Sequence, residues 1–388
     1  MPTMHQYANL RAKLTVAACF FLGTFAVLEI VGRILLAPPP PNSFPGLSPN
    51  EIAHDELLWH HQPGFDDGGE DGPINNLGFR GPEISQTKSP GQFRILSLGE
   101  SSSYGTGVGW QETYAYVLEK KINTQEHDVQ VINAGVRAWS TLQSARFLEL
   151  KIDELQPDLV LVYHEVNDFL PTSHRGINLH GSGMNDVEVM ALYKSRRWFR
   201  WIIQNSRFVA GIRLIIARAR ASTIARITAE FRKQDVLSQP INTYFNIHRA
   251  QNNKKPWLSN PNPIVRLPTP LREKALQSLI NTAQSRGVQI IFLHPSYRIS
   301  RPHRCVMTRI ARAQKIPLLE MDDVIYSHAA RTGRHKAEYF IFGDKVHPNQ
   351  LGHAVMGKGI ADFLLKNNLI HPQPPTGTRG PAATTLPG

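Results

Sequence analysis

A serine, an aspartate and a histidine of this chain have the types and the sequence context needed for nucleophilic catalysis. Ser101 lies within residues 99–105, directly after the apolar run 93–98 and before a segment that we expect to be helical. A tight strand-to-helix turn exposes such a serine, but its hydroxyl is a weak nucleophile without a base and an oxyanion site. Asp344 and His347, three residues apart, supply a carboxylate and an imidazole. Together the three side chains could catalyse acyl transfer.

Five short apolar runs rich in Val, Ile and Leu predict the strands of one sheet, and they cover residues 94–98, 129–133, 159–163, 288–293 and 316–321. Helical-looking segments lie between most of them, and the clearest, residues 271–286, is closed by Gly287. This alternation predicts a three-layer α/β/α fold, in which helices cover both faces of a parallel sheet of roughly five strands. Functional sites of such open sheets form at the carboxyl ends of the strands.

Polar or glycine-containing motifs follow three of these predicted strands. The first is the turn that holds Ser101, the second is residues 133–136, and the third is residues 165–168. Each motif alone is weak evidence, because glycine and Asn-Asp pairs often mark turns after strands. Their order along the chain, followed by Asp344 and His347, favours one shared catalytic site.

In this order the motifs resemble the four sequence blocks of the SGNH, or GDSL, hydrolase family. The matching residues are, block by block, Gly99, Glu100, Ser101 and Ser103, then Gly135, then Asn167 and Asp168, then Asp344 and His347. Glu100 stands where the family usually has an aspartate, and Glu165 stands where the third block often has a glycine. Residues 75–81 are similar to the lead-in of membrane-anchored bacterial relatives, which favours that branch of the family.

The resemblance implies a flavodoxin-like sheet and a serine esterase or acylhydrolase that needs no cofactor and no metal. Ser101 would attack an ester carbonyl, His347 would take its proton and later deliver it to the leaving alcohol, and Asp344 would orient the imidazole. The backbone N–H groups of Ser101 and Gly135, with the side-chain amide of Asn167, would form the oxyanion hole. The ester would belong to an envelope lipid or carbohydrate.

Two other functions are compatible with the same motifs. An O-acyltransferase acting on a cell-envelope or exported polysaccharide would use the same triad, because only the acceptor that displaces the enzyme ester differs. A non-catalytic, membrane-tethered binding module could also have kept the fold. In each case we expect Asp168 to order the loop of Asn167, and His294 and His353 to stand outside the catalytic set.

An N-terminal apolar run, which begins at Leu14 and ends at Ala37 before four prolines, predicts a membrane-spanning helix. Its 24 residues would extend about 36 Å at about 1.5 Å per residue, enough for a bilayer core of about 30 Å. Glu29 and Arg33 interrupt the run at positions i and i+4, where they can pair on one helix face. We therefore expect one membrane anchor.

Basic residues flank only one side of this anchor. Arg11 and Lys13 precede it, whereas residues 38–79 contain no lysine or arginine. The positive-inside rule then keeps the N-terminal tail in the cytoplasm and places the catalytic domain on the periplasmic side of the inner membrane. A cleaved signal peptide, or a lipoprotein processed at Cys19, is the alternative interpretation of the same run.

A strongly basic insertion is expected at about residues 170–265. Residues 194–233 alone contain eleven Lys or Arg residues and one acid, Glu230, and so carry most of the formal net charge of +12. A helix over residues 207–220 would be amphipathic, with Phe208 and Ile212 on its apolar side. It could bind anionic lipid headgroups beside the anchor, or pack on the domain as a lid. No recognised nucleic-acid-binding module is present, so we expect no nucleic-acid partner.

The remaining organisation follows from composition. We expect a cytoplasmic tail at residues 1–13, a Pro/Gly-rich linker and lead-in at 38–90, the hydrolase domain at 91–370, and a disordered tail at 371–388. With 388 residues, of which 41% are hydrophobic, the chain is long enough to bury a substantial core. The acidic residues 66–72 lack the spacing of a calcium-binding loop, and two distant cysteines predict neither a disulfide framework nor a thiolate metal site.

Overall fold

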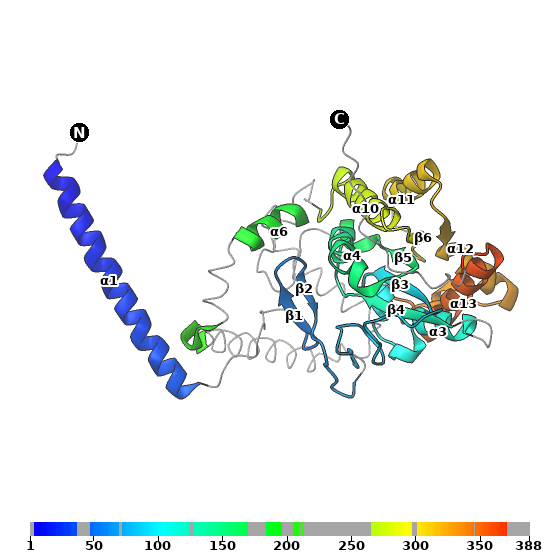
Figure 1. Ribbon diagram of the computed structural model, residues 1–388, viewed down its shortest axis with the longest axis horizontal. Helices are drawn as coiled ribbons and strands as arrows, with labels where there is room; N and C mark the ends of the chain where they lie inside the picture. The colour runs from blue at the N-terminus through cyan, green and yellow to red at the C-terminus, as the bar shows by residue number, and fades with distance from the viewer. Residues whose placement is uncertain are drawn as a thin grey trace, which may run out of the picture. The chain divides into compact units, whose positions relative to one another are not determined.

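The computed structural model describes residues 4–36, 47–69, 72–123, 128–169, 184–195, 205–209, 211–212, 265–296, 301–344 and 346–370. The chain forms two compact units (Figure 1). One comprises residues 1–44 and 192–240, and the other comprises residues 45–191 and 241–388. Ala37 at the end of the predicted anchor, residues 38–46 at the start of the predicted linker, most of the basic insertion and the predicted disordered tail at 371–388 lie outside the described residues.

The second unit contains a parallel five-stranded sheet with the strand order β4-β3-β5-β6-β7. Its strands are β3 (Phe93–Gly99), β4 (Val129–Gly135), β5 (Leu159–Tyr163), β6 (Gln289–His294) and β7 (Leu318–Glu320). All five predicted strands are confirmed, and only the last differs appreciably in length. It is shorter than residues 316–321 because the N–H of Ile316 still bonds to the carbonyl of Ala311, and because Met321 already begins the next helix.

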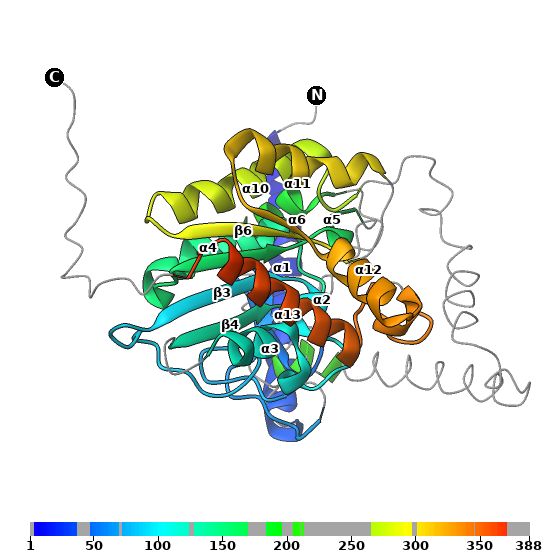
Figure 2. The same ribbon diagram turned by 90° about the vertical axis from the view of Figure 1, so that its right-hand side faces the viewer.

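Helices cover both faces of this sheet, as predicted (Figure 2). One face carries α3 (Tyr114–Ile122), α12 (Met321–Thr332) and α13 (Gln350–Lys366), and the other carries α4 (Thr141–Leu155), α10 (Thr269–Gln284) and α11 (Arg301–Gln314). Every residue of β3 and β5 is therefore buried. The predicted helix 271–286 is α10, which begins two residues earlier because Pro270 is compatible with its first turn.

Short elements lie between these strands and helices along the chain. They are α2 (Ser101–Tyr104), the 3-10 helix η1 (Trp110–Glu112), α5 (Val166–Phe169), α6 (Asp186–Ser195) and the 3-10 helix η4 (Lys336–Tyr339). α2 follows β3 directly and α5 follows β5, and these two strands are neighbours in the sheet. The first and third predicted motifs are therefore brought to one edge.

The segment before the sheet is folded as well. It contains an antiparallel hairpin of β1 (Glu51–His54) and β2 (Leu58–His61). Within this hairpin Trp59 is fully buried, and its indole N–H donates to the carbonyl of Arg137 at 3.1 Å. The indole of Trp139 donates in return to the carbonyl of Trp59 at 3.0 Å. The hairpin thus clamps the turn that follows β4.

The first unit contains α1 (Met4–Leu35), drawn in blue in Figure 1. Its part from Ala12 to Leu35 is long and apolar enough to cross a membrane, which makes it a candidate transmembrane span. The predicted span ends at residue 37, two residues beyond the last helical residue, Leu35. The same unit contains residues 205–209 and 211–212 of the basic insertion, most of which are helical.

Candidate active site

The three predicted catalytic side chains meet in one hydrogen-bonded chain. The hydroxyl of Ser101 lies 2.9 Å from Nε2 of His347. Nδ1 of the same imidazole lies 2.6 Å from a carboxylate oxygen of Asp344. Ser101 is the first residue of α2, whereas Asp344 and His347 lie just before α13. Ser101 and His347 are 246 residues apart in the sequence. This is the geometry that acyl transfer by an activated serine requires.

The loop that carries Asp344 and His347 is closed by its own backbone. An isolated bridge pairs Phe340 with Pro348, and the N–H of Ile341 donates to the carbonyl of His347 at 3.0 Å. The Asp344 carboxylate also accepts the backbone N–H of His347 and that of the preceding residue. These bonds fix the acid and the base relative to each other before any substrate binds.

The electrostatics of the pair favour an ionised Asp344. Partial burial alone would raise the pKa of its carboxyl group, but hydrogen bonds from the His347 ring and from two backbone N–H groups outweigh burial and lower the pKa to about 2. Asp344 is therefore a carboxylate at any physiological pH. It can hold a proton on Nδ1 of His347 and leave Nε2 as the acceptor for the serine proton.

Glycines let α2 pack tightly on the sheet. A side chain at Gly99 would collide with Ser103, and one at Gly135 would collide with the backbone of Ser103 and Tyr104. The backbone of Gly135 therefore closely approaches α2, and its N–H donates to the side-chain oxygen of Asn133 at 3.1 Å. The structure thus gives Gly135 a packing role next to the nucleophile, while its predicted role as an oxyanion donor stays a prediction.

Asn167, the other predicted oxyanion donor, lies on α5 and is largely buried. Its side-chain amide donates to the carbonyl of Trp139 at 3.0 Å. Its backbone N–H donates to the carboxylate of Glu100, the residue before the nucleophile, at 3.3 Å. A carboxamide has two N–H groups, so the bond to Trp139 orients the group and leaves a second donor.

Asp168 orders the loop that carries Asn167, as the sequence predicts. Its carboxylate accepts the hydroxyl of Thr141 at 2.5 Å and the backbone N–H of Thr141 at 2.8 Å. It also pairs with the fully buried Arg272 at 3.0 Å. The start of α4 is thereby tied to the loop that carries Asn167, and the partners of the Asp168 carboxylate are Thr141 and Arg272.

Arg80 belongs to the predicted lead-in motif, but sequence reasoning assigned it no role. It is 4% exposed, and its guanidinium donates to the carbonyls of Tyr104, Gly105 and Val108, each at 2.7 Å. These carbonyls close the C-terminal end of α2, where a cation is favourable. The sequence showed only that the lead-in motif, residues 75–81, contains an arginine. Its distance along the sequence from Ser101 does not indicate that its side chain contacts α2.

Ala138 was also missed. It has a left-handed backbone with φ of 60°, which is costly for a residue with a side chain. Ala138 lies in a turn that is closed by a hydrogen bond from the N–H of Trp139 to the carbonyl of Val136 at 3.2 Å. The N–H of Ala138 takes no part in that bond. The carbonyl of Ala138 accepts from the buried Arg266 at 2.6 Å. The turn is thus held rigidly beside the Asn167 amide.

Three other histidines, two of them buried and one partly buried, make contacts outside the Ser101–His347 pair. Nδ1 of His353 accepts the backbone N–H of Tyr114, and burial with nearby positive charge lowers its pKa to about 3. His294 pairs with Glu320 at 2.7 Å. His60 stacks on Phe147, and burial lowers its pKa to about 4. Within the described part of the chain, no group of three or more His, Cys, Asp or Glu could hold a metal ion.

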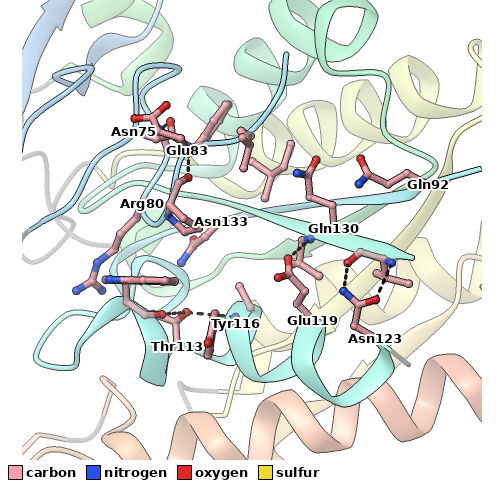
Figure 3. Close-up of a pocket in the computed structure, with 18 of the residues that line it drawn as sticks. Asn75, Arg80, Glu83, Gln92, Thr113, Tyr116, Glu119, Asn123, Gln130 and Asn133 are labelled. Carbon is pink, nitrogen blue, oxygen red and sulfur yellow. Dashed lines mark hydrogen bonds between the residues drawn. The ribbon is translucent and has the colours of Figure 1, made fainter. Parts of the chain in front are cut away.

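A separate cavity of about 250 Å³ lies along β4, an edge strand of the sheet (Figure 3). Side chains of α3 cap this edge: the carboxylate of Glu119 accepts the N–H of Val131 at 2.8 Å, and the amide of Asn123 donates to the carbonyl of Val129 at 3.1 Å. Such capping protects an edge strand from pairing with other chains. Ser101 is not among the residues that line this cavity.

Comparisons with known proteins give one matching family and several similar solved structures. The family model described as GDSL-like lipase/acylhydrolase matches residues 95–360. No protein of curated function matches the chain. Similar solved structures include the psychrotrophic esterase EstA from Pseudoalteromonas sp. (13% identity, 71% of this chain and 99% of that chain, TM-score 0.40). The lipase/acylhydrolase from Enterococcus faecalis (14%, 72% and 98%, TM-score 0.40) and the acetylxylan esterase Axe2 from Geobacillus stearothermophilus (14%, 71% and 93%, TM-score 0.37) are also similar.

Proposed function

Since this chain belongs to the GDSL-like lipase/acylhydrolase family, whose members cleave esters, we propose that it hydrolyses acyl or acetyl esters through Ser101, His347 and Asp344. One observation carries this proposal above the others. The serine hydroxyl lies 2.9 Å from an imidazole nitrogen whose partner nitrogen lies 2.6 Å from a carboxylate. A serine that serves only to cap a helix needs neither partner.

The reaction would proceed in two acyl transfers. In the first, the Ser101 oxygen attacks the ester carbonyl while Nε2 of His347 takes the hydroxyl proton, and the imidazolium then protonates the leaving alcohol. In the second, His347 takes a proton from water, the resulting hydroxide attacks the acyl-serine, and the proton returns to Ser101. Asp344 stays ionised throughout and stabilises the imidazolium in each step.

The tetrahedral intermediates carry a negative oxygen that needs donors. The N–H of Ser101 lies at the first position of α2, where helix N–H groups have no partner within the helix. The second N–H of the Asn167 amide is another donor. The third would be the predicted N–H of Gly135 or, because that N–H already donates to Asn133, the N–H of Ala138 in the turn that follows β4.

The location of the substrate follows from α1. With α1 as a single membrane anchor and the basic flank in the cytoplasm, the catalytic unit would lie on the periplasmic face of the inner membrane. Esters of envelope lipids and of acylated envelope carbohydrates are the esters within reach there. A polysaccharide hydroxyl in place of water in the second step would make the enzyme an O-acyltransferase.

A fluorophosphonate probe tests this proposal on the full chain in detergent. We expect the intact protein to be labelled and Ser101→Ala to be unlabelled. Ser102→Ala is the matched control, because the Ser102 hydroxyl donates to the carbonyl of Val346 instead of facing the imidazole, and it should keep the label. Absence of labelling in the intact, folded protein would overturn the proposal. With an acetyl ester and an oligosaccharide together, free acetate identifies a hydrolase and acetylated sugar identifies a transferase.

A further inference from the structure

Over residues 12–36, one face of α1 and its C-terminal extension is covered while the other side chains are exposed. Among residues 12–36, the side chains that are not fully exposed belong to Phe25, Glu29, Gly32 and Leu36. Their spacing of four, three and four residues places them in one line along the helix. Such a line is the pattern of a helix surface that packs against a partner, and one of its members is an acid within an apolar span.

The partner is a segment of the basic insertion that comprises residues 205–209 and 211–212. The carboxylate of Glu29 accepts the hydroxyl of Ser206 at 2.7 Å. It also accepts the backbone N–H groups of Arg207 at 3.1 Å and Phe208 at 3.3 Å. Arg33, one turn further along α1, pairs with the same carboxylate at 2.9 Å. Glu29 therefore caps the start of the insertion segment.

Apolar contacts and a close approach extend this interface. The rings of Phe25 and Phe208 meet edge to face, with their centroids 5.9 Å apart. A side chain at Gly32 would lie 2.9 Å from the backbone nitrogen of Phe208, so only glycine permits this approach. The guanidinium of Arg207 donates to the carbonyl of Leu36. Small residues, aromatic contacts and satisfied polar groups are typical of helix interfaces in membranes.

The energetics of a bilayer explain why these groups belong together. Glu29 lies six residues before the end of the candidate span, which places it about 9 Å inside that end at about 1.5 Å per residue. An unpaired carboxylate at this depth is costly, and so are the unpaired N–H groups at the start of a helix. The carboxylate of Glu29 and the N–H groups of Arg207 and Phe208 form hydrogen bonds with each other, so neither side needs water as a partner.

We propose that Glu29 is a docking site in the membrane anchor, and that residues 205–209 and 211–212 return to the membrane to bind it. The insertion is then a second membrane-associated element, joined to the outer end of the anchor. The guanidinium of Arg207 donates to the carbonyl of Leu36, just past the end of the candidate span, which is the level where anionic headgroups lie. This inference rests on the proposed anchoring of α1 and is independent of the catalytic triad.

Cysteine cross-linking of the full chain in membrane vesicles tests this docking. The background carries Cys19→Ser and Cys305→Ser, and the test pair is Phe25→Cys with Phe208→Cys. A short bismaleimide should join this pair, as detected by mass spectrometry of digested peptides. The control pair is Val27→Cys with Phe208→Cys, because Val27 is 59% exposed and lies on the opposite side of α1. Equal cross-linking of both pairs, or of neither, would overturn the docking.

Glu29 itself is tested in the same background. Glu29→Leu should abolish the cross-link of the test pair and make the cysteine introduced at position 208 react with a membrane-impermeant maleimide. Glu29→Gln keeps an acceptor and should retain the cross-link, whereas a cross-link that persists in Glu29→Leu would overturn the role of Glu29. Hydrolysis of a water-soluble ester should be unchanged in both variants, which separates this test from that of the esterase. Release of the full chain by alkaline carbonate would refute the anchoring on which the inference rests.

Discussion

The carboxylate of Glu100 accepts the backbone N–H of Asn167 at 3.3 Å, and so joins the turn that carries Ser101 to the loop of the proposed oxyanion donor Asn167. The two residues follow β3 and β5, which are neighbours in the sheet, with Gly99 opposite Tyr163. The family usually has an aspartate at this position, and the longer glutamate is accommodated with no exposed surface. We therefore expect its carboxylate to act by positioning Asn167.

Replacement of Glu100 should reduce turnover by loosening Asn167. We expect Glu100→Ala to lower kcat about tenfold with little change in KM, which is less than the cost of about 10²–10³-fold for deleting an oxyanion donor. The measurement is ester hydrolysis by Glu100→Ala, Asn167→Ala and the double variant. If Glu100 acts through Asn167, its replacement has little further effect once the Asn167 amide is gone. Fully additive losses would contradict this positioning role.

Arg80 should be needed for the geometry of the nucleophile helix. Arg80→Lys removes the planar guanidinium that donates to three carbonyls. We therefore expect the free energy of unfolding to fall by about 1–3 kcal/mol and kcat to fall about tenfold. Urea denaturation and ester hydrolysis measure the two effects separately. The loss of turnover should persist at temperatures where the variant is fully folded.

Arg94 provides a matched control for Arg80. It is also fully buried and donates to three backbone carbonyls, those of Ser85, Gln86 and Leu155, but it lies near the start of β3, at the opposite end from Ser101. Arg94→Lys should destabilise the fold to a similar degree and leave kcat of the folded protein unchanged. An equal loss of kcat in both variants would show that Arg80 acts through stability alone.

Replacement of Ala138 by glycine should stabilise the protein. Its φ of 60° suits glycine, so we expect Ala138→Gly to raise the free energy of unfolding by about 1 kcal/mol. Ala134→Gly is the control, because Ala134 lies within β4 and has no positive φ; it should lower the free energy of unfolding by about 0.5–1 kcal/mol. Urea denaturation of both variants measures the difference. Destabilisation by Ala138→Gly would mean that the side chain contributes more than its backbone costs.

The sequence predicts the sheet, its helices and the triad because each depends on local patterns. Apolar runs define the strands, and the order of Ser101, Asp344 and His347 suffices to bring a base to the nucleophile once the topology is known. Arg80 and Ala138 could not be placed in this way. The contacts of Arg80 depend on where a lead-in loop packs, and the left-handed turn of Ala138 is held by Arg266 from 128 residues away. Such long-range contacts leave no periodicity in the sequence.

Buried histidines should make the fold sensitive to acid. Burial lowers the pKa of His353 to about 3, and that of His164 to about 3 as well. The unfolded chain binds protons below the ordinary histidine pKa of about 6.5, whereas the folded chain does not. Stability is therefore complete above about pH 6.5 and is lost as the pH falls toward about 3, at about 1.4 kcal/mol per pH unit for each such histidine.

His353→Asn tests this dependence, because the oxygen of asparagine can replace Nδ1 as the acceptor for the N–H of Tyr114. Thermal unfolding of the intact protein and of the variant, measured from about pH 7 to about pH 4.5, should show a smaller loss of stability in the variant. The difference should correspond to one proton. Parallel pH profiles for the two proteins would show that His353 is not buried in its neutral form.

Asp344→Asn should abolish most activity without disturbing the loop. The side-chain oxygen of asparagine can still accept the backbone N–H groups that Asp344 now accepts, but its amide would donate to Nδ1 of His347. The imidazole proton then lies on Nε2, which can no longer accept the proton of Ser101, so kcat should fall by about 10³–10⁴. Ester hydrolysis measures this loss, thermal unfolding checks the fold, and Asp323→Asn on α12 serves as a control for the charge. Full activity in Asp344→Asn would show that another group sets the tautomer of His347, and the triad would then have to be redrawn around that group.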